Sequence, residues 1–386
     1  MMKIIFYCQY VFGIGHLFRS LEIVRALSNH EVALVVGGPE VEIDLPDHVK
    51  LVRLPALYMD EKYTTLIPAN PEWSVAQIQR QRKEMLFALF EQFRPDIFIV
   101  ELFPFGRTIF GFELLPVLKA IRKGLFGAVK NVCSLRDVLV EKRDPIEYEE
   151  RVLHGLNELF DFLLIHSDGE LLSLDETFSR SSEISIPISY TGFVTKKPAR
   201  GSGKKNREML GISPEEKLIV ASAGGGRSGY KLLSSVVDAC HLLRDSISVE
   251  LEVFCGPFMD NNAFTRITAK SGPGINVTRF SKHFLDYLQT ADLSVSMAGY
   301  NTCMNILTTK VPALVWPFSG DQEQGLRAER LSRLGAMTVL KDEDLQPERL
   351  AAMIEQGLAA KSQPSVSIDL NGALNTANWL ESLMKQ

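Results

Sequence analysis

The chain alternates between short apolar segments and longer amphipathic ones along nearly its whole length. Short apolar runs between polar or glycine-rich residues predict buried strands, and longer segments with apolar positions every three or four residues predict helices. Strands joined by helices predict a parallel sheet covered by helices on both faces. The strands expected in the first half are Ile4–Gln9, Val32–Gly37, Val49–Leu54, Ile97–Leu102, Val129–Ser134 and Phe162–His166.

Three helices are expected between these strands, at His16–Asn29, Val75–Phe93 and Ile109–Lys123. Within the second of them, one helical stripe is apolar and the basic residues lie off it. The stripe consists of Ile78, Met85, Leu89 and Phe93, and the residues off it include Arg80, Arg82 and Lys83.

A basic segment near the middle of the chain predicts a domain boundary. Six basic residues occur between Lys196 and Arg207, together with glycine and proline, which indicates a linker or exposed loop. The alternation then resumes, with expected strands at Leu218–Ala223, Val249–Cys255, Ile275–Phe280, Leu293–Met297, Ala313–Pro317 and Met337–Leu340. We therefore expect two α/β domains: 1–193, a linker at 194–213, and 214–365, followed by a C-terminal segment at 366–386 whose helix packs on the first domain.

Composition excludes several classes of protein. The chain has 386 residues, of which 46% are hydrophobic and 23% charged, and this is ordinary usage for a globular protein. The formal net charge of −5 is too balanced for a general nucleic-acid binder. The five cysteines are widely spaced and form no CxxC pair, so we expect free thiols in a cytoplasmic protein. No run of about 20 apolar residues suggests a transmembrane segment.

The first glycine-rich junction follows the first expected strand and reads Gly13-Ile14-Gly15-His16, with Arg19 one turn later. Glycines allow a sharp turn and a close approach of a ligand to the backbone. His16 is expected at a helix N-terminus, which disfavours protonation and leaves a neutral imidazole able to accept a proton. A glycine turn with an incidental surface histidine explains this motif equally well.

The second junction, Gly224-Gly225-Gly226-Arg227, directly follows the expected strand Leu218–Ala223. A strand, a glycine run and a helix form the arrangement that binds phosphates through backbone N–H groups, and Arg227 adds a cation. The GK[ST] ending of a P-loop is absent, and so is a GxGxxG dinucleotide fingerprint. A flexible loop before a helix is the alternative.

The third candidate region, Ala291–Ala336, contains two consecutive strand-to-helix junctions. In open α/β sheets, ligands bind beyond the carboxyl ends of the strands. The first junction offers hydrogen-bond donors and the second adds acids and amides, a mixture that suits a polyhydroxylated ligand next to a phosphate. These residues are Ala298, Gly299, Tyr300, Asn301 and Thr302 at the first junction and Asp321, Gln322, Glu323 and Gln324 at the second.

Together these motifs resemble the GT-B glycosyltransferases, most closely the MurG-like group (glycosyltransferase family 28) within the wider UDP-glycosyltransferase superfamily. The resemblance is carried in order by GxGH with Arg19, the Gly224–Gly226 loop, AGYNT before a helix, PALVWPF, and Glu323-Gln324 followed by a helix and LGA. ELFPFGR at 101–107 and SLRD at 134–137 resemble a poorly characterised bacterial branch of predicted glycosyltransferases. The resemblance implies a GT-B architecture of two Rossmann-like, doubly wound parallel-sheet domains facing each other across a cleft.

The resemblance also implies roles for individual residues. On the donor side, Phe280-Ser281 contact the nucleotide base, Gly224 to Arg227 and Ala298 to Thr302 face the diphosphate, and Glu323 and Gln324 hold sugar hydroxyls. Where the family has a glutamate that binds the ribose diol, this chain has Asn305, a weaker partner for a diol. On the acceptor side we expect His16 as general base with Glu101. The acceptor-binding candidates are Gly13, Gly15, Arg19, Arg107 and Arg136, and His166 is a secondary candidate. For Arg136 with Asp137, a structural ion pair is the favoured interpretation.

The expected activity is transfer of a sugar from a nucleotide-diphosphate sugar, with UDP-sugars preferred, to an acceptor hydroxyl or amine. The resemblance implies inversion at the anomeric carbon, and the absence of a convincing DxD pair predicts no metal and no cofactor. The acceptor is a small molecule, a glycan or a lipid-linked molecule, and a peripheral membrane contact is compatible with the basic helix near Lys119. Two alternatives stay open: a nucleotide-sugar hydrolase or 2-epimerase of the same fold, and a non-catalytic nucleotide-sugar-binding protein.

Overall fold

The chain folds into two compact units, which are described separately. The computed structural model describes residues 1–11, 14–38, 40–60, 65–137, 144–198, 202–213, 215–244, 246–320, 322–359 and 367–383, without the side chains of 202–205. Unit 1 consists of Met1–Val194 together with Ile368–Gln386, and unit 2 consists of Thr195–Ser367.

Unit 1 is built on a seven-stranded sheet in which every pairing is parallel. Runs of three to six mostly apolar residues form these strands because both faces of the sheet are covered. The strands are β1 (Lys3–Tyr7), β2 (Glu31–Val36), β3 (Val49–Arg53), β6 (Ile97–Glu101), β7 (Lys130–Leu135), β8 (Phe162–Ile165) and β9 (Ile188–Tyr190), in the order β3-β2-β1-β6-β7-β8-β9. The short strands β4 (Leu57–Met59) and β5 (Leu66–Pro68) form a separate antiparallel pair.

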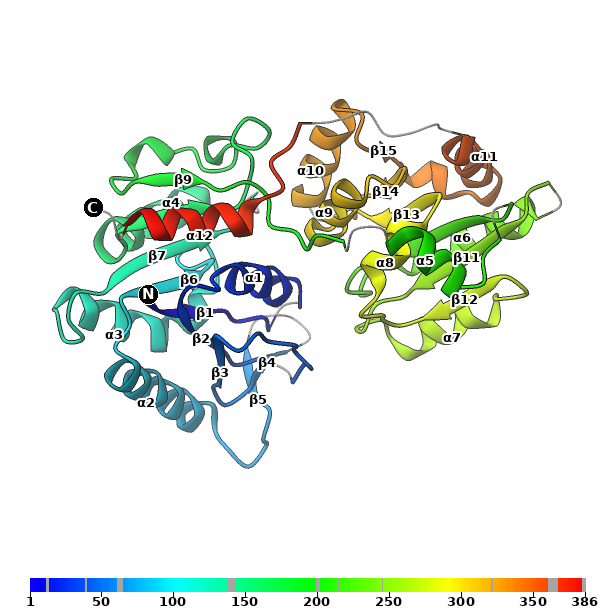
Figure 1. Cartoon of the computed structure of the whole chain (residues 1–386). Coiled ribbons are helices and arrows are strands. Elements are labelled where there is room, and N and C mark those ends of the chain that lie inside the picture. The colour runs from blue at the N-terminus through cyan, green and yellow to red at the C-terminus, as the bar shows by residue number, and fades with distance from the viewer. Residues whose placement is uncertain are drawn as a thin grey trace. The chain divides into compact units, whose positions relative to one another are not determined.

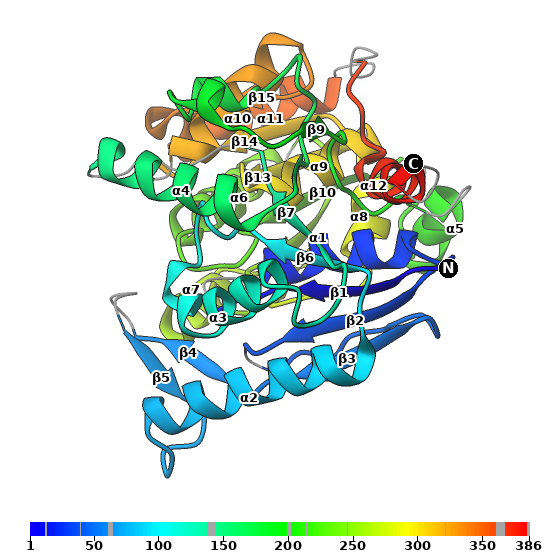
Figure 2. The same ribbon diagram turned by 90° about the vertical axis from the view of Figure 1, so that its left-hand side faces the viewer.

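Helices cover both faces of this sheet (Figures 1 and 2). Alternate residues of β1 point to opposite faces: Ile4 and Phe6 pack in the layer of α1 and α12, and Ile5 and Tyr7 pack in the layer of α2, α3 and α4. The C-terminal helix therefore completes the core of unit 1, where the Trp379 ring meets Phe162 edge to face. The helices are α1 (Gly15–Ala26), α2 (Val75–Phe93), α3 (Gly111–Arg122), α4 (Pro145–Leu159) and α12 (Gly372–Leu383).

Helix α2 has the expected bounds, but its buried face coincides with the predicted stripe only in part. Met85 and Leu89 are only half-buried, and the buried residues are Ile78, Arg82, Leu86, Phe90 and Phe93. Arg82 is inaccessible to solvent because Glu113 of α3, which is equally inaccessible, neutralises it through two hydrogen bonds of 2.9 and 2.6 Å. A charged residue thus occupies a core position, which the apolar pattern alone did not predict.

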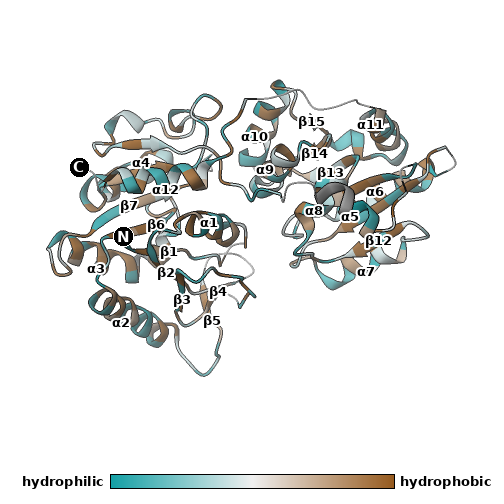
Figure 3. Cartoon of the chain, in the orientation of Figure 1, coloured by the Kyte–Doolittle hydropathy of each residue, from teal (hydrophilic) through white to brown (hydrophobic). Residues whose placement is uncertain are grey.

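Unit 2 is built on a second parallel sheet, of six strands, in the order β12-β11-β10-β13-β14-β15. The strands are β10 (Lys217–Ser222), β11 (Val249–Phe254), β12 (Ile275–Thr278), β13 (Leu293–Met297), β14 (Ala313–Trp316) and β15 (Thr338–Val339). Figure 3 shows apolar stretches in the strands of this sheet and a mixture of apolar and polar residues in the helices around it. The predicted α/β class, with parallel sheets covered by helices, is confirmed for both units.

The helices of unit 2 include one in a segment for which the sequence predicted a linker or exposed loop. The helix α5 begins at Ser202 and ends at Met209. Its Arg207 binds Asp292 at 3.2 Å and also donates to the carbonyl oxygen of Ser213. Its positive charge therefore attaches the segment to the domain instead of keeping it in solvent. The other helices are α6 (Tyr230–Leu243), α7 (Asn261–Ala269), α8 (Phe284–Thr290), α9 (Tyr300–Thr309), α10 (Gln322–Arg333) and α11 (Pro347–Ala359).

Candidate functional site

The first candidate site lies at the carboxyl end of the unit 1 sheet and joins His16 to Glu101. His16 stands in the first turn of α1, the helix after β1, and Glu101 is the last residue of β6. Because β1 and β6 are paired, the two side chains meet: His16 Nδ1 lies 2.7 Å from Glu101 Oε1. Nδ1–H therefore donates to the carboxylate, and among the described residues Nε2 of His16 has no hydrogen-bond partner.

Arginines surround this pair. Arg19, one turn along α1 from His16, donates to the same Glu101 oxygen, and both side chains are almost completely buried. Arg107, also buried, is close enough for its charge to influence both His16 and Glu101. Leu102, directly after Glu101, has a φ of 67°, a left-handed conformation that non-glycine residues rarely adopt and that is often found at functional sites.

Burial sets the charge states of the pair. It lowers the pKa of His16 to about 3, helped by the positive charge of Arg107 and opposed by Glu101. Burial acts to raise the pKa of Glu101, but the hydrogen bond from His16 and the positive charges of Arg19 and Arg107 outweigh it and lower the value to about 2. At neutral pH the imidazole is therefore neutral and the carboxylate is ionised. The sequence predicted a neutral His16 from its place at a helix N-terminus, whereas burial is the main cause in the structure.

His166 cannot touch a substrate, contrary to its place as a secondary candidate. Its side chain is inaccessible to solvent, with Ser134 Oγ 2.8 Å from Nε2 and Thr191 Oγ1 2.8 Å from Nδ1. Burial lowers its pKa to about 3. His166 is thus a neutral core residue that links the carboxyl ends of three neighbouring strands.

Two other acceptor-side candidates, Gly15 and Arg136, lie in the described part of unit 1. Gly15 is the first residue of α1. Arg136 lies 3.2 Å from Asp137, so the favoured structural ion pair is present. Gly13 lies outside the described residues.

The second candidate site lies at the carboxyl end of the unit 2 sheet, around the Gly224–Gly226 loop. Its glycines allow close backbone packing: a Cβ at Gly226 would lie 2.3 Å from the Cys255 carbonyl oxygen, and Gly226 has a φ of 94°. Gly256, in the loop after β11, is equally crowded against Gly224 and Gly225. The two loops can therefore pack this closely only because positions 226 and 256 are glycines.

Two of the three loop amides donate hydrogen bonds within the loop. The Gly224 N–H donates to Ser222 Oγ at 3.1 Å, and the Gly226 N–H donates to the Ala223 carbonyl oxygen at 3.1 Å. Gly225 is exposed and has free space around it. A Cβ there would meet no heavy atom closer than 3.7 Å, in the Phe258 ring. Arg227 lies over the same ring, 5.4 Å from its centroid.

The turn before α9 lies next to this loop because β10 and β13 are paired. A Cβ on Gly224 would come within 3.8 Å of Thr302 Oγ1. Gly299 is the N-cap residue of α9 and provides no side-chain cap. The positive end of the helix dipole therefore lies beside the glycine loop, a placement that favours an anion. Asn305 is half-buried one turn further along the same helix.

The remaining donor-side candidates follow the strands β12 and β14. Phe280 is 55% exposed in the loop after β12, and Ser281 Oγ accepts from the His283 N–H at 3.1 Å. Glu323 and Gln324 lie in the first turn of α10, where Gln324 Oε1 accepts from the Phe318 N–H at 3.3 Å. Asp321 lies outside the described residues.

Two residues at this site were missed by the sequence reasoning. Gly256 was signalled by the Gly-Pro dipeptide that follows β11. Arg327 had no such signal, because it is one of several arginines in the polar helix α10, yet its side chain is only 1% exposed.

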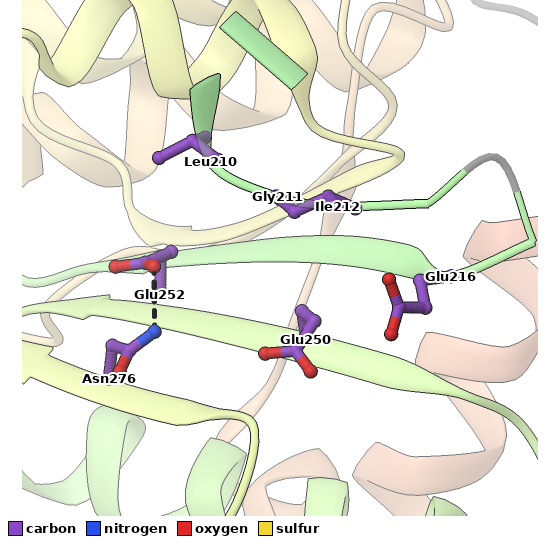
Figure 4. Close-up of a pocket in the computed structure, with 7 residues that line it drawn as sticks. All are labelled: Leu210, Gly211, Ile212, Glu216, Glu250, Glu252 and Asn276. Carbon is purple, nitrogen blue, oxygen red and sulfur yellow. Dashed lines mark hydrogen bonds between the residues drawn. The ribbon is translucent and has the colours of Figure 1, made fainter. Parts of the chain in front are cut away.

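A cavity of about 210 Å³ in unit 2 does not coincide with the candidate donor residues. It lies beside the beginnings of β10, β11 and β12 and is lined by Glu216, Glu250, Glu252 and Asn276, together with Leu210, Gly211 and Ile212 (Figure 4). Asn276 Nδ2 donates to Glu252 Oε1 at 3.0 Å, and burial raises the pKa of Glu252.

Residues 220–374 match the sequence model of the glycosyltransferase family 28 C-terminal domain. The chain is 24% identical over 234 residues to an uncharacterised glycosyltransferase of Methanopyrus kandleri, a match that covers 58% of this chain and 61% of the relative. It is 25% identical over 221 residues to the UDP-N-acetylglucosamine–N-acetylmuramyl-(pentapeptide) pyrophosphoryl-undecaprenol N-acetylglucosamine transferase of Chlamydia muridarum, covering 56% of this chain and 58% of the relative. The chain thus matches about three-fifths of the length of these two curated relatives.

The structure is also similar to a solved one along the whole chain. The crystal structure of MurG from Acinetobacter baumannii aligns with a TM-score of 0.56 at 13% identity, covering 100% of this chain and 99% of that one. This likeness confirms the predicted GT-B fold. None of the helices in the described part of the chain has the length and apolar character needed to span a membrane.

Proposed function

The chain carries a glycosyltransferase family 28 C-terminal domain within a MurG-like GT-B fold, and from this premise we propose that it transfers a sugar from a nucleotide-diphosphate sugar to an acceptor hydroxyl or amine. The relatives named above are glycosyltransferases, which favours transfer over hydrolysis, epimerisation or binding alone. A UDP-sugar is the proposed donor, because the Chlamydia muridarum relative is named for UDP-N-acetylglucosamine.

One observation supports the assignment of the donor site. The Gly224–Gly226 loop and the first turn of α9 lie side by side within the segment that matches family 28, with Gly224 next to Thr302. The start of a helix and a glycine loop together favour a diphosphate. We assign the diphosphate to this place, the base to Phe280 and Ser281, and the sugar hydroxyls to Glu323 and Gln324.

The chemistry follows from the His16–Glu101 pair. Nε2 of His16 accepts the proton of the acceptor hydroxyl while the acceptor oxygen attacks the anomeric carbon. The bond between that carbon and the β-phosphate oxygen breaks, and the nucleoside diphosphate leaves with the electron pair. A single displacement of this kind inverts the anomeric configuration. Glu101 holds the imidazole through Nδ1 and stabilises the imidazolium that forms.

The leaving diphosphate needs positive charge, which the protein supplies without a metal in this proposal. The first turn of α9, the Gly225 amide and Arg227 stabilise the developing negative charge. Unit 1 then binds the acceptor near Arg136, the buried Arg19 and Arg107 keep Glu101 ionised, and unit 2 binds the donor. The five cysteines are buried free thiols, which fits the cytoplasmic location that we propose.

The proposal is tested first by ligand screening. Thermal-shift measurements with UDP, GDP, dTDP and CDP should show stabilisation by at least one nucleotide, since a ligand at 100 times its Kd adds about 2.7 kcal/mol. Stabilisation by none of them would refute the donor assignment. If nucleotide is released from the donor at the full rate without any acceptor, the reaction is hydrolysis and not transfer.

The role of His16 is tested by substitution. His16→Ala should lower kcat by about 10²–10⁴-fold and leave donor affinity unchanged. His154→Ala, at an exposed position of α4, is the matched control. Weaker donor binding with an unchanged single-turnover rate would reassign His16 to binding.

A further inference from the structure

Arg327 is a buried arginine in the middle of α10, and its burial needs a physical reason. Its side chain is 1% exposed, whereas Arg333, two turns later on the same helix, is 64% exposed. Arginine is almost never fully buried unless its charge is paired. The partners of Arg327 therefore show what this side chain does.

Two of the elements that Arg327 contacts belong to the proposed donor site. Arg327 Nη1 donates to the Ala298 carbonyl oxygen at 3.3 Å, and its guanidinium lies 5.4 Å from the centre of the Tyr300 ring. On its other side, Nη2 lies 4.0 Å from Glu323 Oε2, one helical turn back on α10. Helices α9 and α10 are neighbours in the fold (Figure 1), and Arg327 joins the beginnings of both.

We propose that Arg327 is a positioning residue of the donor site, one that holds the Ala298–Thr302 turn and Glu323 in a single geometry. This inference rests on the proposed function. The turn is assigned to the diphosphate and Glu323 to the sugar, so one guanidinium orients the groups that recognise two adjacent parts of the donor.

The chemistry of the side chain fits this role. A planar guanidinium donates in two directions at once and can lie against an aromatic ring, whereas a lysine ammonium is a point charge. An apolar side chain would fill the same space but would leave the Ala298 carbonyl without this donor and Glu323 without this cation. Arg327 therefore fixes orientation in addition to filling volume.

The test is a double-substitution cycle in the full chain, with isothermal titration by UDP and UDP-N-acetylglucosamine as probes. Arg327→Met should raise the Kd of both probes about tenfold. Glu323→Gln should raise the Kd of UDP-N-acetylglucosamine alone. The double variant should bind UDP-N-acetylglucosamine no more weakly than Arg327→Met alone, because Glu323 is already misplaced in Arg327→Met. If the two residues acted independently, the fold-increases in Kd of the single variants would multiply in the double variant.

Two further variants separate positioning from a structural role. Arg327→Lys should keep the melting temperature near that of the unmodified protein and weaken binding less than Arg327→Met. If Arg327→Met does not fold, the Kd values of Arg327→Lys test the positioning role in its place. Arg333→Met, the exposed control, should change nothing. A lower melting temperature with unchanged Kd values, or multiplicative losses in the cycle, would overturn the proposal for Arg327 alone. Failure of the unmodified protein to bind UDP, GDP, dTDP or CDP would overturn the proposed function as well.

Discussion

Two neutral histidines in unit 1, the half-buried His16 and the fully buried His166, make its stability sensitive to acid. His16 and His166 both have a pKa lowered by burial to about 3, against an ordinary value of 6.5. Below pH 6.5 the unfolded chain takes up protons at these positions while the folded chain does not. The folded form is therefore at its most stable above pH 6.5 and loses stability as the pH falls toward 3.

The size of the effect follows from these values. Between pH 7.5 and pH 5, each imidazole that titrates near 6.5 when unfolded and near 3 when folded costs about 2 kcal/mol of unfolding free energy. The two together cost about 4 kcal/mol, a large share of the stability of an ordinary domain. His30, whose pKa burial also lowers, adds to the same trend.

The assay must report on unit 1 separately from unit 2. Urea titrations at several pH values, each followed by a brief maleimide pulse at one fixed pH, label cysteines as they become exposed. Cys133 is buried in unit 1 and Cys240 in unit 2, so mass spectrometry of their peptides measures the two unfolding transitions in one sample. Neither His16 nor His166 lies in unit 2, which makes Cys240 the internal control.

Substitutions then assign the effect to each histidine. His166→Gln and His16→Gln should each remove about 2 kcal/mol of the pH dependence reported by Cys133. His154→Gln should leave it unchanged, because the His154 side chain is 70% exposed. A change below about 1 kcal/mol in the unmodified protein between pH 7.5 and 5 would refute the reasoning, since it would mean that the folded chain also binds these protons.

Three further predictions concern the packing of each unit and the donor site. Gly226→Ala should destabilise unit 2 by more than about 2 kcal/mol in the Cys240 transition because its Cβ would meet the Cys255 carbonyl oxygen, whereas Gly225→Ala should be tolerated; equal effects would contradict the described packing. Glu113→Gln should cost unit 1 about 3–5 kcal/mol by leaving the Arg82 charge buried and unpaired, and Arg82→Met combined with Glu113→Leu should recover most of that loss; an additive double variant would count against the pairing. Arg227→Ala should weaken nucleotide binding by about 10–100-fold in calorimetry, and an unchanged affinity would remove Arg227 from the donor site.

The architecture was predictable because buried parallel strands leave a strong apolar signal. The expected strand at Leu293–Met297 and the expected helix at Val75–Phe93 have the observed bounds. The order of motifs along the chain also placed the candidates at strand ends, which is why His16 and Glu101 could be paired before their geometry was known. Their roles in the reaction stay predictions.

What the sequence did not predict depends on contacts between distant segments. Arg82 is buried because Glu113, 31 positions later, neutralises it, and no local pattern contains that information. The Gly224 and Gly226 amides are used within their own loop, and part of the glycine content there serves packing against Gly256. The central role of Arg327 likewise appears only when α9 and α10 are brought together.

The central claim is that the carboxyl end of the unit 2 sheet binds a nucleoside diphosphate. A crystal structure of the chain with the nucleotide that stabilises it most tests this directly. We expect the diphosphate between the Gly225 amide and the first turn of α9, with the base against Phe280. A nucleotide bound elsewhere, or a diphosphate without contact to either the loop or the helix, would contradict the account.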